Sequence, residues 1–152
     1  MNLTKLFYLL ATFLLTSSFY LGTNTAVLTC KSDSGKTTFV ANLQDITSMF
    51  ESAKFTIDNS TIEFDSNDKA SVALDSKKGV FTLYIDGRKT FDYPNGKFIQ
   101  FWAIPSSFKI IKEESGHKVY EFKAKIKGTD PRLTKKSNSS VIELNCKLEW
   151  EI

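Results

Sequence analysis

The chain has 152 residues, of which 20 are Lys or Arg and 17 are Asp or Glu, for a net charge of +3 at pH 7. Positive and negative residues are mixed along the chain, so it lacks the basic surface that nucleic acids need, and a nucleic-acid partner is excluded. The length suits one domain with a real core and is short for two. We therefore expect a single-domain monomer.

The N-terminal segment, residues 1–26, has the layout of a secretory signal peptide: Lys5, then an apolar run, then small or polar residues up to Ala26. The run is shorter than the roughly 20 apolar residues of a membrane-spanning helix. We expect this segment to be removed on export, leaving residues 27–152 as one periplasmic or secreted domain that meets the membrane only through the signal. A cut after Ser18 and an uncleaved membrane anchor are the alternatives.

The only two cysteines, Cys30 and Cys146, lie near the two ends of the expected domain. In an exported protein such a pair predicts a disulfide. Bridged Cα atoms lie within about 7 Å of each other, so the first and last strands should be neighbours. A lipid anchor on Cys30 is the rival interpretation, but it would leave Cys146 without a partner.

The stretch Ser34–Thr37 contains Gly-Lys-Thr beside an expected strand, as a phosphate-binding loop does. In that loop a first glycine belongs where this chain has Cys30, and a helix should follow. The residues that follow alternate instead, as in a strand. We predict a hairpin turn and no nucleotide site.

Residues 43–53 break the strand pattern, because their apolar residues recur at helical spacing and Asn42 precedes them as an N-cap. Elsewhere from Thr37 onward, short alternating runs are separated by Gly, Asn, Asp and Pro, as in strands joined by tight turns. The predicted fold class is all-β: a single antiparallel β-barrel or β-sandwich domain of about 8–10 strands, with one short helix at about 43–53.

The stretch Asp65–Ala70 places Asp65, Asn67 and Lys69 at alternate positions, as a calcium loop places its ligands. A lysine in the third ligand position argues against calcium, and so do the missing turn glycine and the missing terminal glutamate. We predict a solvated turn.

The candidate ligand or partner surface lies in residues 97–111 and consists of Phe98, Phe101, Trp102 and Phe108. Phe98 and Trp102 share one face of the expected strand, and Phe101 lies on the other. One interpretation is a central strand that is buried on both faces. The other is that one face binds a small apolar molecule or a protein partner, since uncovered aromatic surface is typical of interaction sites.

His117 is the only histidine, so a histidine triad or a multi-histidine metal site would depend on it. It follows a turn in which Ser115 is poorly placed to exchange a proton with it. We predict no catalytic residue, no metal and no cofactor, and hence a non-catalytic binding module. The alternatives are an envelope or extracellular hydrolase that uses a carboxylate pair, and a passive surface component.

Residues 141–152 show the clearest alternation in the chain, with apolar residues on one face, Cys146 among them, and polar or charged residues on the other. This pattern predicts a strand with one face in the core.

An exported β domain with one cysteine in its first strand and one in its last loosely resembles the membrane-bound and periplasmic C-type lysozyme inhibitors. The resemblance implies an inhibitor-like role and carries over no site residue, because that family's signature loop has no counterpart here.

Overall fold

The computed structural model describes residues 25–45, 49–129 and 141–151, which form ten β-strands and two short 3-10 helices. In chain order the elements are β1 (Thr25–Lys31), β2 (Thr37–Asp45), β3 (Met49–Ile57), β4 (Ser60–Asp65), β5 (Lys69–Asp75), η1 (Ser76–Lys78), β6 (Val80–Gly87), β7 (Lys97–Ala103), η2 (Pro105–Ser107), β8 (Lys109–Glu114), β9 (His117–Gly128) and β10 (Val141–Glu151). The all-β prediction is confirmed. Most of the predicted signal peptide lies outside the described residues.

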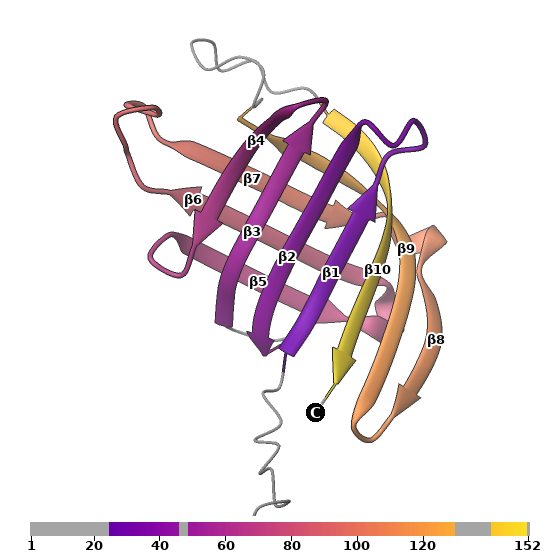
Figure 1. The fold of residues 1–152 in the computed structure, drawn as a ribbon. Helices are drawn as coiled ribbons and strands as arrows, with labels where there is room; N and C mark the ends of the chain where they lie inside the picture. Colours follow the sequence, from indigo (N-terminus) through magenta and orange to yellow (C-terminus); the bar gives the residue numbers. More distant parts are fainter. Residues whose placement is uncertain (1–24, 46–48, 130–140, 152) are drawn as a thin grey trace, which may run out of the picture.

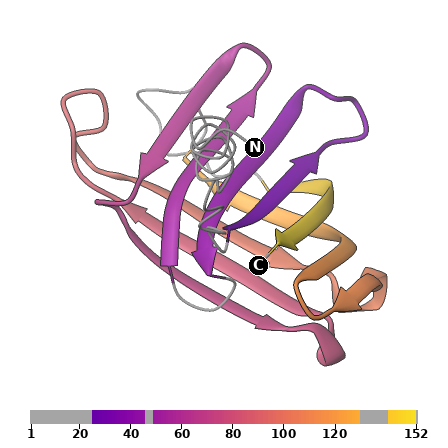
Figure 2. The same ribbon diagram turned by 60° about the horizontal axis from the view of Figure 1, so that its bottom comes forward.

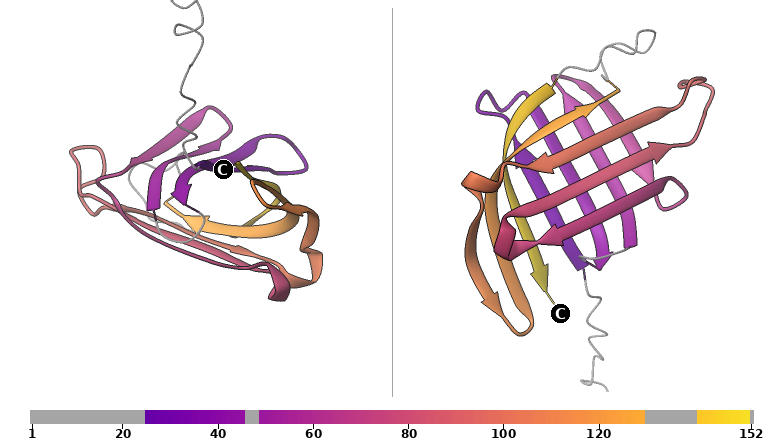
Figure 3. Two further views of the ribbon diagram at one scale, coloured as in Figure 1. Left: turned by 90° about the horizontal axis from the view of Figure 1, so that it is seen from below. Right: turned by 180° about the vertical axis from the view of Figure 1, so that it is seen from behind.

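All ten strands belong to one antiparallel sheet in the order β4-β3-β2-β1-β10-β9-β7-β6-β5, with β8 also paired to β9. The sheet curls into a half-barrel, so that β1–β4 form a front layer and β5–β7 cross behind it (Figures 1 and 2). The long strands β9 and β10 lie between the two layers in the sheet order and connect them (Figure 3). The chain therefore buries the inner face of one curled sheet against itself.

The predicted helix at 43–53 is wrong. Residues up to Asp45 continue β2, and residues from Met49 onward begin β3, with Leu43 opposite Phe50 and Ala41 opposite Ala53. Between Asn42 and Leu43 the register shifts so that β3 carries an extra residue, and its inward-facing Phe50 and Ala53 lie three positions apart instead of two. Apolar residues that are cross-strand neighbours in this hairpin thus recur along the chain at the spacing of a helix.

The predicted disulfide is confirmed. Cys30 on β1 lies directly opposite Cys146 on β10, their Cα atoms are 4.1 Å apart, and both side chains are buried on the inner face.

Ala26, earlier on β1, is also fully buried and lies opposite Trp150. A signal cut after Ala26 would therefore remove a residue of the core, whereas a cut after Ser18 would leave β1 whole.

Aromatic rings fill the space between the two layers. Phe101 on β7 lies with its ring centroid 5.5 Å from that of Phe39 on the facing strand β2, 5.8 Å from Phe81 and 6.4 Å from Phe122. All four side chains are at most 4% exposed. Because one ring contacts both layers and both neighbouring strands, Phe101 stands at the centre of the core.

Tyr120 brings a hydroxyl group into this core. Its ring is 1% exposed and lies 5.5 Å from that of Phe108, and its hydroxyl donates a 2.9 Å hydrogen bond to Oε1 of Glu113 on β8. Burial, and then the carboxylate of Glu113, raise the pKa of Tyr120 to about 12. The folded protein therefore holds this proton more tightly than the unfolded chain does.

We expect the wild-type protein to lose stability between about pH 10, where a free tyrosine ionises, and about pH 12, where Tyr120 does. A raised folded-state pKa contributes stability that is complete below the lower value and is lost as the pH rises, at up to about 1.4 kcal/mol per pH unit. Urea unfolding across this window should show a shallower pH slope for Tyr120→Phe. The exposed Tyr84→Phe should keep the wild-type slope, and identical slopes for all three proteins would contradict this assignment.

Candidate functional site

The outward side chains of β6 and β7 form an aromatic surface, which we call the Tyr84–Trp102 face. It consists of Thr82, Tyr84, Phe98, Gln100 and Trp102. They project outward because both strands alternate with buried residues, which occupy the core face. No described element lies over this face in the view from behind (Figure 3, right). The face is therefore open.

The structure separates the four predicted surface residues. Phe98 and Trp102 lie on the Tyr84–Trp102 face and are half-buried. Phe101 belongs to the core, and Phe108 is partly buried, with its ring stacked at 5.1 Å on that of Phe122. The sequence thus identified two members of an outer aromatic surface together with two residues that pack inside.

Tyr84 also belongs to this face, although the sequence analysis did not name it among the candidate surface residues. Its side chain is 45% exposed, and it lies opposite Gln100 and diagonal to Trp102 across the β6–β7 pair. Residues 80–85 have apolar side chains on both faces of their strand, and this pattern could have indicated an apolar outer surface there. Which of the two faces points outward depends on the curl of the whole sheet, so the pattern alone did not single out Tyr84.

Between these aromatic residues the surface is hollowed. The depression has a volume of about 270 Å³ and is lined by Ser71, Thr82, Leu83, Tyr84, Gln100, Phe101 and Trp102. Tyr84 and Trp102 offer flat apolar area with a polar edge, while the hydroxyl and amide groups around them donate and accept hydrogen bonds. Such a surface can pack against an apolar group and fix its orientation.

Two lysines border the face on β9. Lys125 lies opposite Trp102, and Lys127 lies opposite Gln100, both half-buried. Lysine stems cover apolar surface while their ammonium groups stay in water. This edge of the Tyr84–Trp102 face is therefore positively charged and suits a partner with acidic groups at the rim of its own contact surface.

The turn considered for calcium, at the β4–β5 corner, has its carboxylates engaged by the protein. The side chain of Asp68 is 1% exposed and accepts hydrogen bonds from the backbone N–H groups of Asp65 and Arg88, at 3.0 and 2.9 Å. The Arg88 guanidinium lies 2.7 Å from Asp65. A backbone hydrogen bond from Asn67 is the main cause that lowers the pKa of Asp65. These contacts tie the corner to the end of β6.

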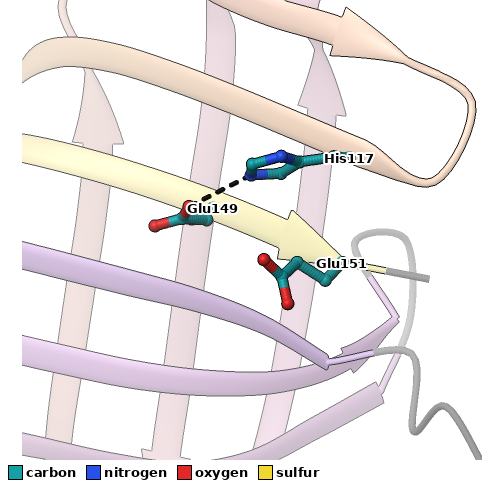
Figure 4. A group of neighbouring side chains, drawn as sticks. All are labelled: His117, Glu149 and Glu151. Atoms are coloured by element: carbon teal, nitrogen blue, oxygen red, sulfur yellow. Dashed lines mark hydrogen bonds and ion pairs between the residues drawn. The ribbon is translucent and has the colours of Figure 1, made fainter.

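A second polar cluster lies on the outer face near the end of β10 and consists of His117, Glu149 and Glu151 (Figure 4). His117 is the first residue of β9, with its side chain 31% exposed, and its Nε2 atom lies 3.1 Å from Oε1 of Glu149. The Lys147 ammonium lies 2.6 Å from the other oxygen of Glu149. Lys147 and then His117 lower the pKa of Glu149. The sequence placed His117 beside a turn, but its partners are more than thirty residues away along the chain.

No family model, no curated protein and no solved structure matches this chain. The function must therefore be argued from the geometry of the molecule.

Proposed function

We propose that the chain is an exported, non-catalytic binding module that docks a protein partner through the Tyr84–Trp102 face. The observation that carries this proposal is the exposure of Tyr84, 45%, beside half-buried Trp102 and Phe98 on an open sheet face. Tyr and Trp are enriched at protein interfaces, where a few such residues carry most of the binding free energy. Soluble proteins seldom leave clustered aromatic surface uncovered without a use for it.

A protein partner suits this face better than a small apolar molecule does. The inner face of the sheet is packed with aromatic and aliphatic side chains, and small-molecule sites are usually concave and enclose most of their ligand. The depression at Tyr84 and Trp102 has a volume of about 270 Å³, below the roughly 300–1,000 Å³ of typical small-molecule sites. A broad partner surface can cover it and remove both aromatic rings from water.

Export is the second part of the proposal, and the buried disulfide supports it, because such bonds persist outside the reducing cytosol. Within the described residues, no helix has the length and apolarity that crossing a membrane requires. We place the signal cut upstream of Thr25, since cleavage after Ala26 would remove a residue that packs in the core. The intact mass of the exported chain locates this cut.

The binding proposal predicts a specific crosslinking pattern in the organism that produces the chain. A photoreactive benzoylphenylalanine at position 84 should crosslink to one defined protein, which mass spectrometry identifies. The same probe at Lys54, exposed on β3 of the opposite layer, should not. With the purified partner, Trp102→Ala should weaken binding by at least about 30-fold, since interface hot spots contribute about 2 kcal/mol or more.

The matched control is Lys54→Ala, which should bind the partner as the wild type does. An unchanged dissociation constant for Trp102→Ala would overturn the proposed face. Crosslinks of equal yield from positions 84 and 54 would show that the contact is not specific to this surface.

A further inference from the structure

The outer face at the start of β9 brings together four titratable side chains from three strands. Cross-strand register places His117 between Glu151 on β10 and Glu114 on β8, and Glu149 lies diagonally beside it. Neighbouring strands are about 4.8 Å apart, which brings such side chains within reach of one another. Three of these side chains, those of His117, Glu149 and Glu151, lie close enough together to hold one metal ion, whereas Glu114 pairs with Lys112 at 3.2 Å.

One ligand atom from each of these three residues lies within 4.8 Å of the other two. A zinc ion holds imidazole nitrogen and carboxylate oxygen at about 2.0–2.2 Å, so two of its ligands are separated by roughly 3–3.6 Å. The Nε2 atom of His117 and the Oε1 atom of Glu149 are already 3.1 Å apart. The side chain of Glu151 is exposed and lies beside Glu149 at the end of β10 (Figure 4).

The surroundings of Glu149 also match those of a metal-binding carboxylate. Its Oε2 atom accepts a hydrogen bond from Lys147 at 2.6 Å, which leaves Oε1 directed at His117. Ligating carboxylates are commonly held in this way by a second hydrogen-bonding partner that fixes their orientation. With the neutral imidazole, the two glutamates and Lys147 carry a net charge of −1, which attracts a divalent cation.

We propose that His117, Glu149 and Glu151 bind one zinc ion, with His117 contributing Nε2, Glu149 contributing Oε1 and water completing the coordination. The ion takes the place of the proton that His117 and Glu149 share in their hydrogen bond. An imidazole ligand favours zinc over calcium or magnesium, which prefer sites built only from oxygen. This site lies apart from the Tyr84–Trp102 face: His117 and Lys125, which borders Trp102, are eight residues or roughly 26 Å apart along β9.

The site can be tested directly because His117 is the only histidine. Its two imidazole C–H protons give a single pair of signals in the aromatic proton NMR spectrum. Addition of zinc chloride to the disulfide-closed protein should shift or broaden both signals, with saturation at one equivalent per chain. Zinc should also raise the melting temperature, and EDTA should reverse the rise, because a ligand that binds only the folded state stabilises it.

Three variants examine the ligand set, each first compared with the wild type in EDTA to show that it is folded. His117→Ala should abolish the zinc-dependent rise in melting temperature, and Glu151→Gln and Glu149→Gln should each weaken zinc binding by at least about tenfold. The control is Glu143→Gln on the same face of β10, which pairs with Lys123 and should bind zinc as the wild type does.

Two outcomes would overturn the proposal. Imidazole signals that do not move with zinc at millimolar concentration would exclude a site at His117. Signals that move equally in the wild type, Glu149→Gln and Glu151→Gln would show that the histidine binds zinc alone, without the two glutamates. Neither result would affect the proposed Tyr84–Trp102 face, which shares no residue with this site.

Discussion

Removal of the Cys30–Cys146 disulfide should lower the free energy of unfolding by about 4–5 kcal/mol, on the chain-entropy account of a loop of more than a hundred residues. The bond joins the first strand to the last at a position where they already pair. Its loss should therefore leave the fold in place and make unfolding easier, because the reduced unfolded chain gains freedom. Since small domains have only about 5–15 kcal/mol of stability in total, the effect should be large.

Urea unfolding with and without a reductant measures this effect, followed by far-UV circular dichroism. The double variant Cys30→Ala/Cys146→Ala is the control: it should unfold near the midpoint of the reduced wild type and should not respond to the reductant. Equal midpoints for oxidised and reduced wild type would show that the bond adds nothing to stability.

The disulfide was predictable because the chain has only two cysteines and a signal-like N-terminus, and the alternation of the last strand agreed with it. Cys146 lies on the apolar face of the last strand, and a buried bridge to Cys30 requires the first strand to lie beside the last, as the β1–β10 register shows. The inward direction of Cys146 follows from the period-two geometry of a strand, and the pairing of the first and last strands follows from the short reach of a disulfide. The sequence therefore supported the strands and this pairing.

The helix prediction failed for a reason that is equally local. Leu43 and Phe50 are seven residues apart, which in a helix places them on one face, but here they are cross-strand partners in the β2–β3 hairpin. Periodicity counts residues along the chain and does not distinguish two turns of helix from a pair of strands joined by a short connection. The register shift beside Leu43 interrupts the alternation of β3, where Phe50 and Ala53 both pack toward the core although they are three residues apart.

The candidate sites show a different limit. Alternation showed that Phe101 and Trp102 point to opposite faces of β7, but the curl of the sheet decides which face is the core. The cluster at His117 depends on the register between β9 and β10, which places Glu149 and Glu151 beside a histidine more than thirty residues earlier. Neither the curl of the sheet nor the register between β9 and β10 can be read directly from a single sequence.

The adjacent residues Phe101 and Trp102 should therefore respond very differently to truncation. Phe101→Ala should lower the free energy of unfolding by about 3–5 kcal/mol, because the lost ring is in contact with Phe39, Phe81 and Phe122 and a cavity would form at the centre of the core. Trp102→Ala, on the open outer face, should cost about 1 kcal/mol. Urea unfolding followed by circular dichroism measures both without depending on the tryptophan signal.

Phe101→Leu is the conservative control and should lose about 1–2 kcal/mol, since leucine fills part of the volume that alanine leaves empty. A Trp102→Ala variant as unstable as Phe101→Ala would mean that Trp102 packs as a core residue, and the Tyr84–Trp102 face would lose its basis. A stable Trp102→Ala variant that no longer binds the partner would instead assign this side chain to recognition. Because the two residues share one strand and one sequence context, the contrast between them isolates the effect of the face on which each lies.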